Sequence, residues 1–400
     1  MSDHIPFEIQ LEIMNGLPVK SLLRFRSVSK RWKSLIDSSG FIAQYSSQRQ
    51  HLLLRYEDVR SNGGHYASFV VDDGDSFPTQ SVSVTLPELV KKLKRNSYTI
   101  TDGDSFRRQS VSVTLPDLVK RINYEYSYTT IVSSHGLFCF FCDCPEPWET
   151  ATRAVIWNPS IRKAVDVVVP RLTSCNAYRT ALGFGVCGKT MDPKIVKITR
   201  YSSPIDRDSW QVEVFTLSTR AWRSPYSTSN LPRKSISFVK KPIVVDGCLY
   251  WLACDRFYHL IVSFDLTSEE FRQVNLPDSL AHTKFSLFMY NLRESIVVLE
   301  HRVEANKQVY HVWMMEDGVT KSFNKLSTIS NHSSEVSIVG VMGFRKTGEL
   351  LIEYKLTHHH YHYDTRILIG YDPSSKSTSD VGINGRNFSV YSYMETLLLL

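Results

Sequence analysis

Two clusters of side chains have residue types that bind metals or act as nucleophiles. One is a run of cysteines and the other a run of histidines, namely Cys139, Cys142 and Cys144, and His358, His359, His360 and His362. A structural zinc site takes four ligands, usually from well-spaced pairs, and no second Cys or His pair follows the cysteines at such a spacing. We therefore expect packed thiols, an exposed histidine segment, and neither a metal nor a cofactor.

The other candidate chemistry is short and unspecific. The Asp-x-Asp pairs at 73–75 and 102–104 lack the Gly and Glu spacing of a calcium loop and are typical of turns. Residues 107–110, Arg-Arg-Gln-Ser, resemble a basic-directed phosphorylation site. The sequence has no Gly-rich phosphate loop, nucleophile elbow or metalloprotease motif. These patterns favour a protein that is not an enzyme.

The composition is that of an ordered globular protein with a sizeable core. Of 400 residues, 42% are hydrophobic, 12% aromatic and 22% charged. Seven cysteines without a regular framework indicate reduced thiols. No apolar stretch approaches the ~18 to 20 residues of a membrane span, and no signal peptide is visible. We expect a cytoplasmic or nuclear protein rather than a secreted disulfide scaffold, a membrane protein or a disordered chain.

Residues 5–45 have a helical pattern that differs from the rest of the chain. Ile5, Ile9 and Ile13 share one apolar face, Pro6 suits a first helical turn, and Gly16 a helix end. A second helix is predicted from Pro18, with Leu22 and Phe25 on its inner side. A third is predicted near Ser27, which can cap it, with helical spacing at Val28, Trp32, Leu35 and Ile36. Three such short helices would be marginal alone, so we expect part of their apolar surface to belong to a partner.

The other side of this helical module is basic. Between residues 17 and 36 there is no acidic residue, and the basic ones are Lys20, Arg24, Arg26, Lys30, Arg31 and Lys33. A solvated helix face and a helix-turn-helix on DNA are alternatives, although the third helix has few Asn or Gln side chains for base edges. The net charge of +7 suits an acidic partner without requiring nucleic acid.

Segment 5–36 resembles an F-box in its plant form. The matching residues are Ile5-Pro6-x-Glu8-Ile9 and Leu17-Pro18-Val19-Lys20-Ser21-Leu22-Leu23-Arg24-Phe25-Arg26-x-Val28-Ser29-Lys30-x-Trp32-x-Ser34-Leu35-Ile36. Ile5 stands where the family usually has Leu, and Ser27 where it has Cys. The resemblance implies docking on the Skp adaptor of a cullin-based (SCF) ubiquitin ligase. The adaptor-binding residues it implies are Ile5, Pro6, Ile9, Ile13, Leu17, Pro18, Val19, Leu22, Leu23, Phe25, Val28, Trp32, Leu35 and Ile36.

From about residue 48 the pattern changes to short strands and turns. A strand ending near an aromatic residue, then a polar turn and a second strand, recurs about every 50 residues, which is typical of a kelch-like propeller with one four-stranded blade per repeat. The aromatic positions are Trp157, Phe215, Phe264, Trp313 and Tyr371, with a further copy upstream at Phe69. Segments 73–77 and 81–92 recur at 102–106 and 110–121, an offset of 29 residues, so a tandem duplication within about 73–122 displaces the upstream copy.

The same region resembles the plant type-1 F-box-associated domain. The matching stretches are 131–141, 156–163, 183–185, 245–252, 264–266 and 343–349. There are two departures: His135 precedes Gly136 where the family usually has Asn, and an Asp-Tyr pair is missing before Lys194. Together with the F-box, this resemblance covers nearly the whole chain.

These observations predict an α+β multidomain protein, with a three-helix F-box in residues 1–47 and an all-β, propeller-like domain of six or seven blades in residues 48–400. The resemblance implies a non-catalytic substrate-recognition subunit that binds the Skp adaptor, through it a cullin, and an unidentified protein substrate. Membranes and nucleic acid are not expected partners. The alternatives are a propeller that binds a small ligand or glycan, an F-box assembly that is not a ligase, and a DNA-binding helical head.

Overall fold

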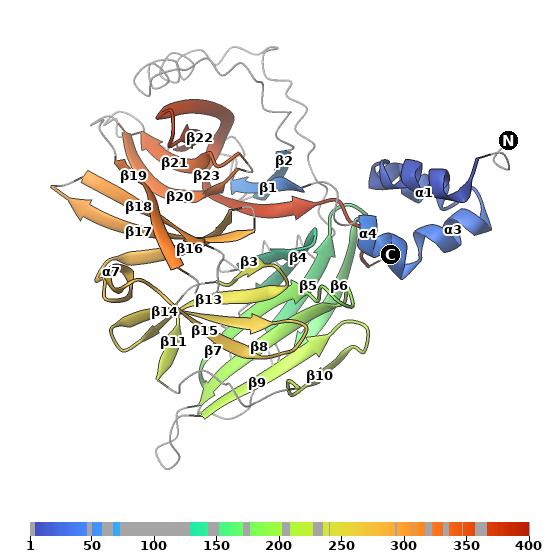
Figure 1. Ribbon diagram of the computed structural model, residues 1–400, viewed down its shortest axis with the longest axis horizontal. Coiled ribbons are helices and arrows are strands. Elements are labelled where there is room, and N and C mark those ends of the chain that lie inside the picture. The colour runs from blue at the N-terminus through green and yellow to red at the C-terminus, as the bar shows by residue number, and fades with distance from the viewer. Residues whose placement is uncertain are drawn as a thin grey trace.

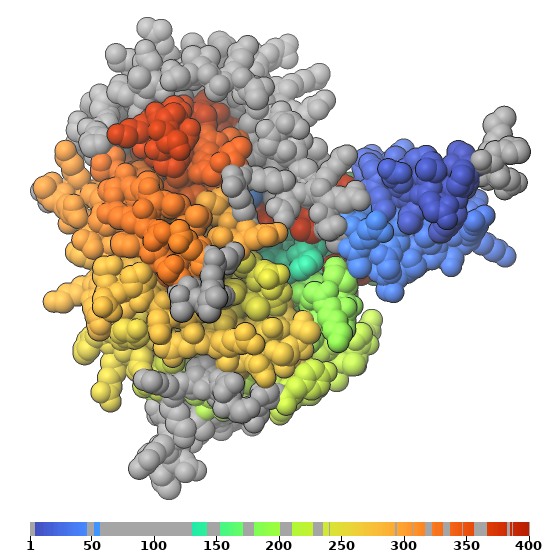
Figure 2. Space-filling model, viewed as in Figure 1, coloured from blue at the N-terminus to red at the C-terminus, as the bar shows by residue number. Residues whose placement is uncertain are grey.

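The protein has a small helical head beside a much larger β domain (Figure 1). The computed structural model describes residues 5–45, 50–57, 67–72, 129–142, 152–170, 177–201, 209–226, 235–239, 241–292, 294–305, 307–316, 322–330, 336–345, 347–356 and 366–399. The head contains α1 (Phe7–Asn15), α2 (Val19–Phe25), α3 (Lys30–Ile36) and α4 (Ser39–Tyr45). Figure 2 shows it as a separate lobe attached to one side of the β domain.

The helices of the head begin and end where local side chains dictate. Pro6 and Pro18 precede α1 and α2, where a missing N–H costs nothing. The cap of α3 is Ser29, whose Oγ accepts a hydrogen bond from the Trp32 N–H at 3.1 Å. The prediction of Ser27 as this cap is wrong, because the Ser27 hydroxyl instead donates to the Arg24 carbonyl at the end of α2.

The sequence predicted three helices, and the head has four. Before α4, the Ser38 Oγ accepts a hydrogen bond from the Phe41 N–H at 3.3 Å. The rings of Phe41 and Tyr45, one turn apart, stack at 6.1 Å and are buried. This fourth helix therefore contributes directly to the core of the head.

Five antiparallel sheets make up the β domain in the described part of the chain. The first sheet contains β3 (Thr129–Ser134), β4 (Leu137–Cys142), β5 (Thr152–Asn158) and β6 (Lys163–Val169), and the second contains β7 (Ala177–Val186), β8 (Pro193–Tyr201), β9 (Ser209–Thr216) and β10 (Ala221–Arg223). The third contains β11 (Ile236–Phe238), β12 (Ile243–Val245), β13 (Cys248–Asp255), β14 (Tyr258–Asp265) and β15 (Phe271–Asn275), and a short helix, α7 (Asp278–Ala281), follows it.

The last two sheets complete a closed ring. The fourth contains β16 (Ser286–Leu292), β17 (Ser295–Glu304), β18 (Lys307–Glu316) and β19 (Ser322–Ser330). The fifth contains β20 (Val336–Phe344), β21 (Leu350–Leu356), β22 (Arg366–Asp372) and β23 (Ser377–Met394), extended by β1 (Gln50–Glu57) and β2 (Ala67–Asp72). Contacts between strands of successive sheets run from β3 to β7, β7 to β13, β12 to β16, β16 to β20, and β23 back to β3.

The repeat inferred from the aromatic residues is present, but the prediction of six or seven blades is wrong. Each of the five aromatic positions lies on the third strand of its sheet in hydrogen-bonded order, namely on β5, β9, β14, β18 and β22, counted from β3, β7, β11, β16 and β20. The upstream copy at Phe69 lies on β2, which forms no separate blade in the described residues. The reason is β23, an 18-residue strand that pairs first with β22 and then with β1, so that β1 and β2 join the fifth sheet. The duplication within 73–122 lies outside the described residues.

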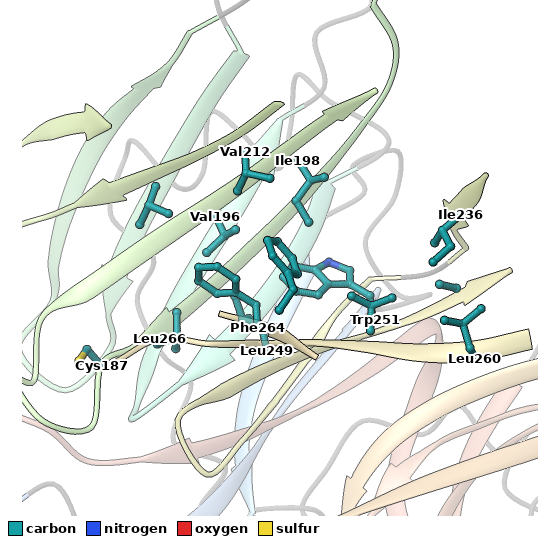
Figure 3. Close-up of a cluster of buried hydrophobic side chains, with 14 residues drawn as sticks. Cys187, Val196, Ile198, Val212, Ile236, Leu249, Trp251, Leu260, Phe264 and Leu266 are labelled. Carbon is teal, nitrogen blue, oxygen red and sulfur yellow. The ribbon is translucent and has the colours of Figure 1, made fainter. Parts of the chain in front are cut away.

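The apolar core of the β domain lies between neighbouring sheets. Between the second and third sheets, Val196 and Ile198 of β8 face Leu249 and Trp251 of β13 (Figure 3). A Cβ added at Gly183 would lie 2.5 Å from Cζ2 of Trp251, so only glycine permits this approach. Such packing is typical of propellers, in which each blade buries its faces against two neighbours.

Candidate functional site

The head exposes large apolar side chains. Ile5, Ile9 and Ile13 lie at intervals of four residues on or just before α1, and Ile13 is 53% exposed. Val28, between α2 and α3, is 67% exposed. With Phe7, these residues form what we call the exposed apolar residues of the head. Exposed apolar residues gathered on one small lobe are typical of a surface that binds a partner.

The fourteen residues predicted to bind the adaptor fall into three groups in the structure. Those exposed are Ile5, Pro6, Ile9, Ile13, Pro18 and Val28. Those half-buried are Leu17, Leu23, Phe25, Trp32 and Leu35. Those buried inside the head are Val19, Leu22 and Ile36. Only the first two groups can contact a partner directly, whereas the third holds the helices together.

Two of the half-buried residues, Phe25 and Trp32, form an aromatic pair. The rings of Phe25 on α2 and Trp32 on α3 meet edge to face, with centroids 5.1 Å apart. This pair joins the two helices and leaves part of each ring accessible. Edge-to-face aromatic pairs are worth about 0.5–1.5 kcal/mol beyond their buried area, so the pair stabilises the head as well as its surface.

The head also presents positive charge, as its sequence predicted. The side chains exposed to solvent are those of Lys20, Arg24, Lys30, Arg31 and Lys33. Arg31 lies over the ring of Phe7, with 5.4 Å from its guanidinium carbon to the ring centroid. Arg26 instead pairs with Asp37, with donor–acceptor distances of 2.6 and 3.0 Å, and the hydrogen bond to Asp37 raises the pKa of the Arg26 guanidinium. Apolar and basic side chains therefore meet on one small lobe.

Sequence reasoning missed the part of the head that comes from the other end of the chain. Leu397 is fully buried in the apolar core of the head, beside Met14, Leu22 and Ile36. Glu395 accepts hydrogen bonds from the Val19 N–H at 3.1 Å and the Tyr45 hydroxyl at 3.4 Å. The signal that could have revealed this contact is the run of leucines at 397–400, which no pattern in the sequence connects to the helices.

The predicted cysteine and histidine clusters are only partly described. Cys139 is buried on β4 within the core of the first sheet, as expected for a packed thiol. The side chain of Cys142, Cys144 and the histidine tract lie outside the described residues. Within the described ranges, no three His, Cys, Asp or Glu side chains are grouped closely enough to hold a metal ion. No helix in those ranges has the length and apolar character needed to cross a membrane.

Two buried glutamates hold parts of the β domain together. Glu269 accepts hydrogen bonds from Lys194 at 2.9 Å and from Arg223 at 2.6 and 2.7 Å, and thereby joins the second and third sheets. Burial alone would raise the pKa of Glu269, but the hydrogen bonds from Arg223 and Lys194 outweigh burial and lower it. Both carboxylate oxygens are thus occupied by protein donors, which is typical of a structural ion pair.

The second buried carboxylate joins the connection before β16 to the fourth sheet. Glu300 accepts hydrogen bonds from Thr283 at 2.6 Å and from Arg302 at 2.9 Å, and lies 3.2 Å from Nδ1 of His311. Burial alone would raise the pKa of Glu300, but the hydrogen bonds from Arg302 and Thr283 lower it below its usual value. Arg302 also lies over the ring of Phe285, 4.9 Å from its centroid.

Exposed aromatic side chains lie at both ends of the strands of the β domain and are separate candidates for binding contacts. Tyr226 lies beside Glu269 of the β14–β15 turn, at the end of β14 opposite to Phe257. Phe257, at the tip of the β13–β14 turn, is 90% exposed. Phe285 and Tyr226 are also exposed, and each stacks on an arginine, Arg302 and Arg223 respectively. Aromatic residues and arginines dominate binding energy at many protein interfaces.

Comparison with known proteins gives a family match for each of the two regions. The family model described as "F-box domain" matches residues 2–44, and that described as "F-box associated beta propeller domain" matches residues 81–355. A putative F-box protein of Arabidopsis thaliana is 24% identical over 390 residues, which cover 96% of this chain and 86% of that protein. An F-box/kelch-repeat protein of the same plant is 26% identical over 360 residues, covering 86% of this chain and 74% of that protein.

The two matches agree with the two regions of the structure. The first covers the four helices of the head, and the second covers most of the sheets that form the ring. The chain belongs to the family of plant F-box proteins that carry an F-box associated β-propeller domain.

Proposed function

We propose that this protein is the substrate-recognition subunit of an SCF-type ubiquitin ligase, acting in the cytoplasm or nucleus. The head would bind a Skp-type adaptor, which links it to a cullin, and the β domain would bind a target protein. The observation that carries this proposal is the set of exposed apolar residues of the head, next to exposed basic side chains.

The contribution of such a subunit is proximity. Holding a target beside the ubiquitin-transfer machinery raises its effective concentration there, and this requires no catalytic group in the chain itself. The exposed aromatic residues Phe257, Phe285 and Tyr226 are the proposed place to look for contacts with the target.

Direct binding to a purified Skp-type adaptor tests the proposal for the head. The double variant Ile9→Asp, Ile13→Asp puts two charges on the exposed side of α1 without touching the core of the head. We expect at least about a hundredfold weaker adaptor binding, which corresponds to about 2.7 kcal/mol.

The matched control is Leu326→Asp, the same kind of change at an exposed leucine on β19 of the β domain. This variant should bind the adaptor as the unaltered protein does. If the unaltered chain does not bind the adaptor, or if the α1 variant binds it equally well, the proposed role of the head is wrong.

Target capture tests the β domain. After proteasome inhibition, an N-terminally tagged chain should retain a specific target protein, and Phe257→Ala, Phe285→Ala or Tyr226→Ala should reduce its recovery without changing adaptor binding. An N-terminal tag is preferable because Leu397 and Leu398 are buried at the other end. Recovery that is unchanged in all three variants would place the target contacts elsewhere.

A further inference from the structure

The segment that follows β23 contacts both regions of the molecule. We call residues 395–398 the C-terminal clasp. On the side of the head, Leu397 is fully buried among residues of all four helices. Glu395 accepts a hydrogen bond from the Val19 N–H, one of the donors in the first turn of α2 that have no carbonyl partner within the helix.

Glu395 also lies close to the hydroxyl of Tyr45, which contacts the segment between α1 and α2. The Tyr45 hydroxyl donates to the Leu17 carbonyl at 2.8 Å and lies 3.4 Å from the Glu395 carboxylate. Leu17, Pro18 and Val19 are consecutive residues of the F-box motif. The clasp, which begins 376 residues after Val19, therefore contacts the backbone of this segment of the head directly at Val19 and through Tyr45 at Leu17.

The clasp is equally tied to the first sheet of the β domain. The Nδ2 of Asn158 donates to the Thr396 carbonyl at 3.0 Å and to the Leu398 carbonyl at 2.7 Å. The Ser160 Oγ accepts a hydrogen bond from the Thr396 N–H at 3.1 Å. A Cβ added at Gly136 would lie 2.1 Å from the Met394 carbonyl oxygen, so the backbone passes directly against this turn.

Comparison with equivalent turns of other sheets shows what Asn158 contributes. Asp265 and Asp372 occupy the same place, at the end of the third strand of their sheets. In all three turns a side-chain oxygen accepts a backbone N–H two residues later: Ser160 at 2.8 Å, Thr267 at 2.7 Å and Ser374 at 2.8 Å. An aspartate thus suffices for the turn, and the extra amide group of Asn158 serves the clasp.

We propose that the C-terminal clasp completes the core of the F-box within the same chain and fixes the head in one orientation relative to the β domain. Ile42 of α4 and Ile161 of the β5–β6 turn lie at the same junction and pack into the cores of the opposite regions. The two regions then move as one body. Under the proposed function, this would set the position of a bound target relative to the ubiquitin-transfer machinery.

The sharpest test is Asn158→Asp. It keeps the oxygen that forms the turn, as in Asp265 and Asp372. It removes the two hydrogen bonds to the clasp and sets a carboxylate oxygen against the Thr396 and Leu398 carbonyls, so it acts directly on the clasp. Spin labels are placed through unnatural amino acids at two exposed residues, Ser34 on α3 and Lys189 in the β7–β8 turn. In the full chain we expect a single narrow distribution of label-to-label distances, and in the variant a clearly broader one with unchanged helix content.

Leu397→Asp provides a second, stronger disruption, with Leu326→Asp as its matched control. The clasp variant should broaden the distance distribution or lose the helical signal of the head, while the sheets retain their thermal transition. The control should match the unaltered chain. A broad distribution in the unaltered chain, or a narrow one in both Asn158→Asp and Leu397→Asp, would overturn the proposal.

Adaptor binding separates failure of the clasp from failure of the proposed function. Asn158 does not touch the exposed apolar residues of the head, so Asn158→Asp should bind the adaptor within about threefold of the unaltered chain, equivalent to about 0.7 kcal/mol. Absence of adaptor binding by the unaltered chain would refute the proposed function and leave the distance measurement valid. Narrow distances with normal adaptor binding would refute the clasp alone.

Discussion

The helical head and the β domain bury their apolar side chains in different ways. In the β domain, Trp251 is fully buried between the second and third sheets, and Trp157 is fully buried against Phe138 and Phe140. In the head, three of the four helices have seven residues, Ile13 and Val28 face solvent, and part of the core is Leu397 from beyond the last strand. The difference teaches that the β domain is a self-contained scaffold, whereas the head is completed on one side by its own chain and, as proposed, on the other by a partner.

The largest effect is expected in the core of the β domain. Trp251→Ala removes a fully buried side chain between the second and third sheets, and we expect a loss of about 3–5 kcal/mol in the free energy of unfolding. Chemical denaturation followed by fluorescence measures it. Phe257→Ala, on the tip of the turn after β13, is the control and should change stability by less than about 0.5 kcal/mol. Equal losses in both variants would contradict the view of a tightly packed scaffold.

The buried carboxylate of Glu269 allows the stability of the β domain to be tested as a function of pH. At pH 7, Glu269→Gln should cost about 3–5 kcal/mol, because Lys194 and Arg223 lose the charge that compensates them. The pKa of Glu269 is lower in the folded protein than its ordinary value of 4.5, so the stabilisation is present above that pH and is lost as the pH falls through the folded pKa.

Denaturation curves at a series of pH values should therefore show the difference between Glu269→Gln and the unaltered chain shrinking below pH 4.5. Glu270→Gln is the control, since that carboxylate lies 3.7 Å from Arg272 at the surface and surface pairs contribute about 0–1 kcal/mol. A gap that grows towards acid pH would mean that Glu269 is not held ionised by its partners.

In the head, stability and binding should be separable. Leu22→Ala removes a fully buried side chain and should cost about 2–5 kcal/mol, with loss of helical circular dichroism and of adaptor binding together. Ile13→Ala should weaken adaptor binding while leaving the helices and the melting temperature unchanged, because Ile13 faces solvent. If Ile13→Ala also melted the head, the exposed residues would belong to its core.

The smallest effect is expected for the ion pair on the surface of the head. Asp37→Asn removes the charge that Arg26 contacts at 2.6 Å, yet both side chains are about a third exposed. We expect a loss of about 0.2–1 kcal/mol, and less at high salt. Thermal unfolding at low and high ionic strength measures it. A loss as large as that of Glu269→Gln would erase the contrast between the two regions.

Local patterns in the sequence predicted most of the local structure. The spacing of Ile5, Ile9 and Ile13 predicted α1 and its apolar face, and recurring aromatic residues marked the third strand of every sheet in hydrogen-bonded order. The substitution of His135 for the usual Asn has a local explanation as well: His135 and Gly136 both have positive φ, a conformation that the turn between β3 and β4 requires. Helix α4 was missed because Phe41 and Tyr45 alone give too weak a periodic signal.

Features that depend on distant contacts could not be predicted in this way. The number of blades depends on β23 pairing with both β22 and β1, and no periodicity records that choice. Leu22, which was predicted to contact an adaptor, is buried in a core that includes Leu397 from a distant part of the chain. The donors that lower the pKa of Glu269 come from the second sheet, at positions that show no motif.

The clasp also has a consequence for how the protein is made. The Val19 N–H and the Glu395 carboxylate that accepts it are 376 residues apart along the chain. Ribosomes add roughly 5–20 residues per second, so the helices of the head leave the ribosome on the order of tens of seconds before their last core residue exists. The strand that closes the ring, β23, arrives equally late. During this interval Leu22 and Ile36 lack the Leu397 side chain that shares their core in the folded protein, so the core of the head cannot be completed while the β domain is being made.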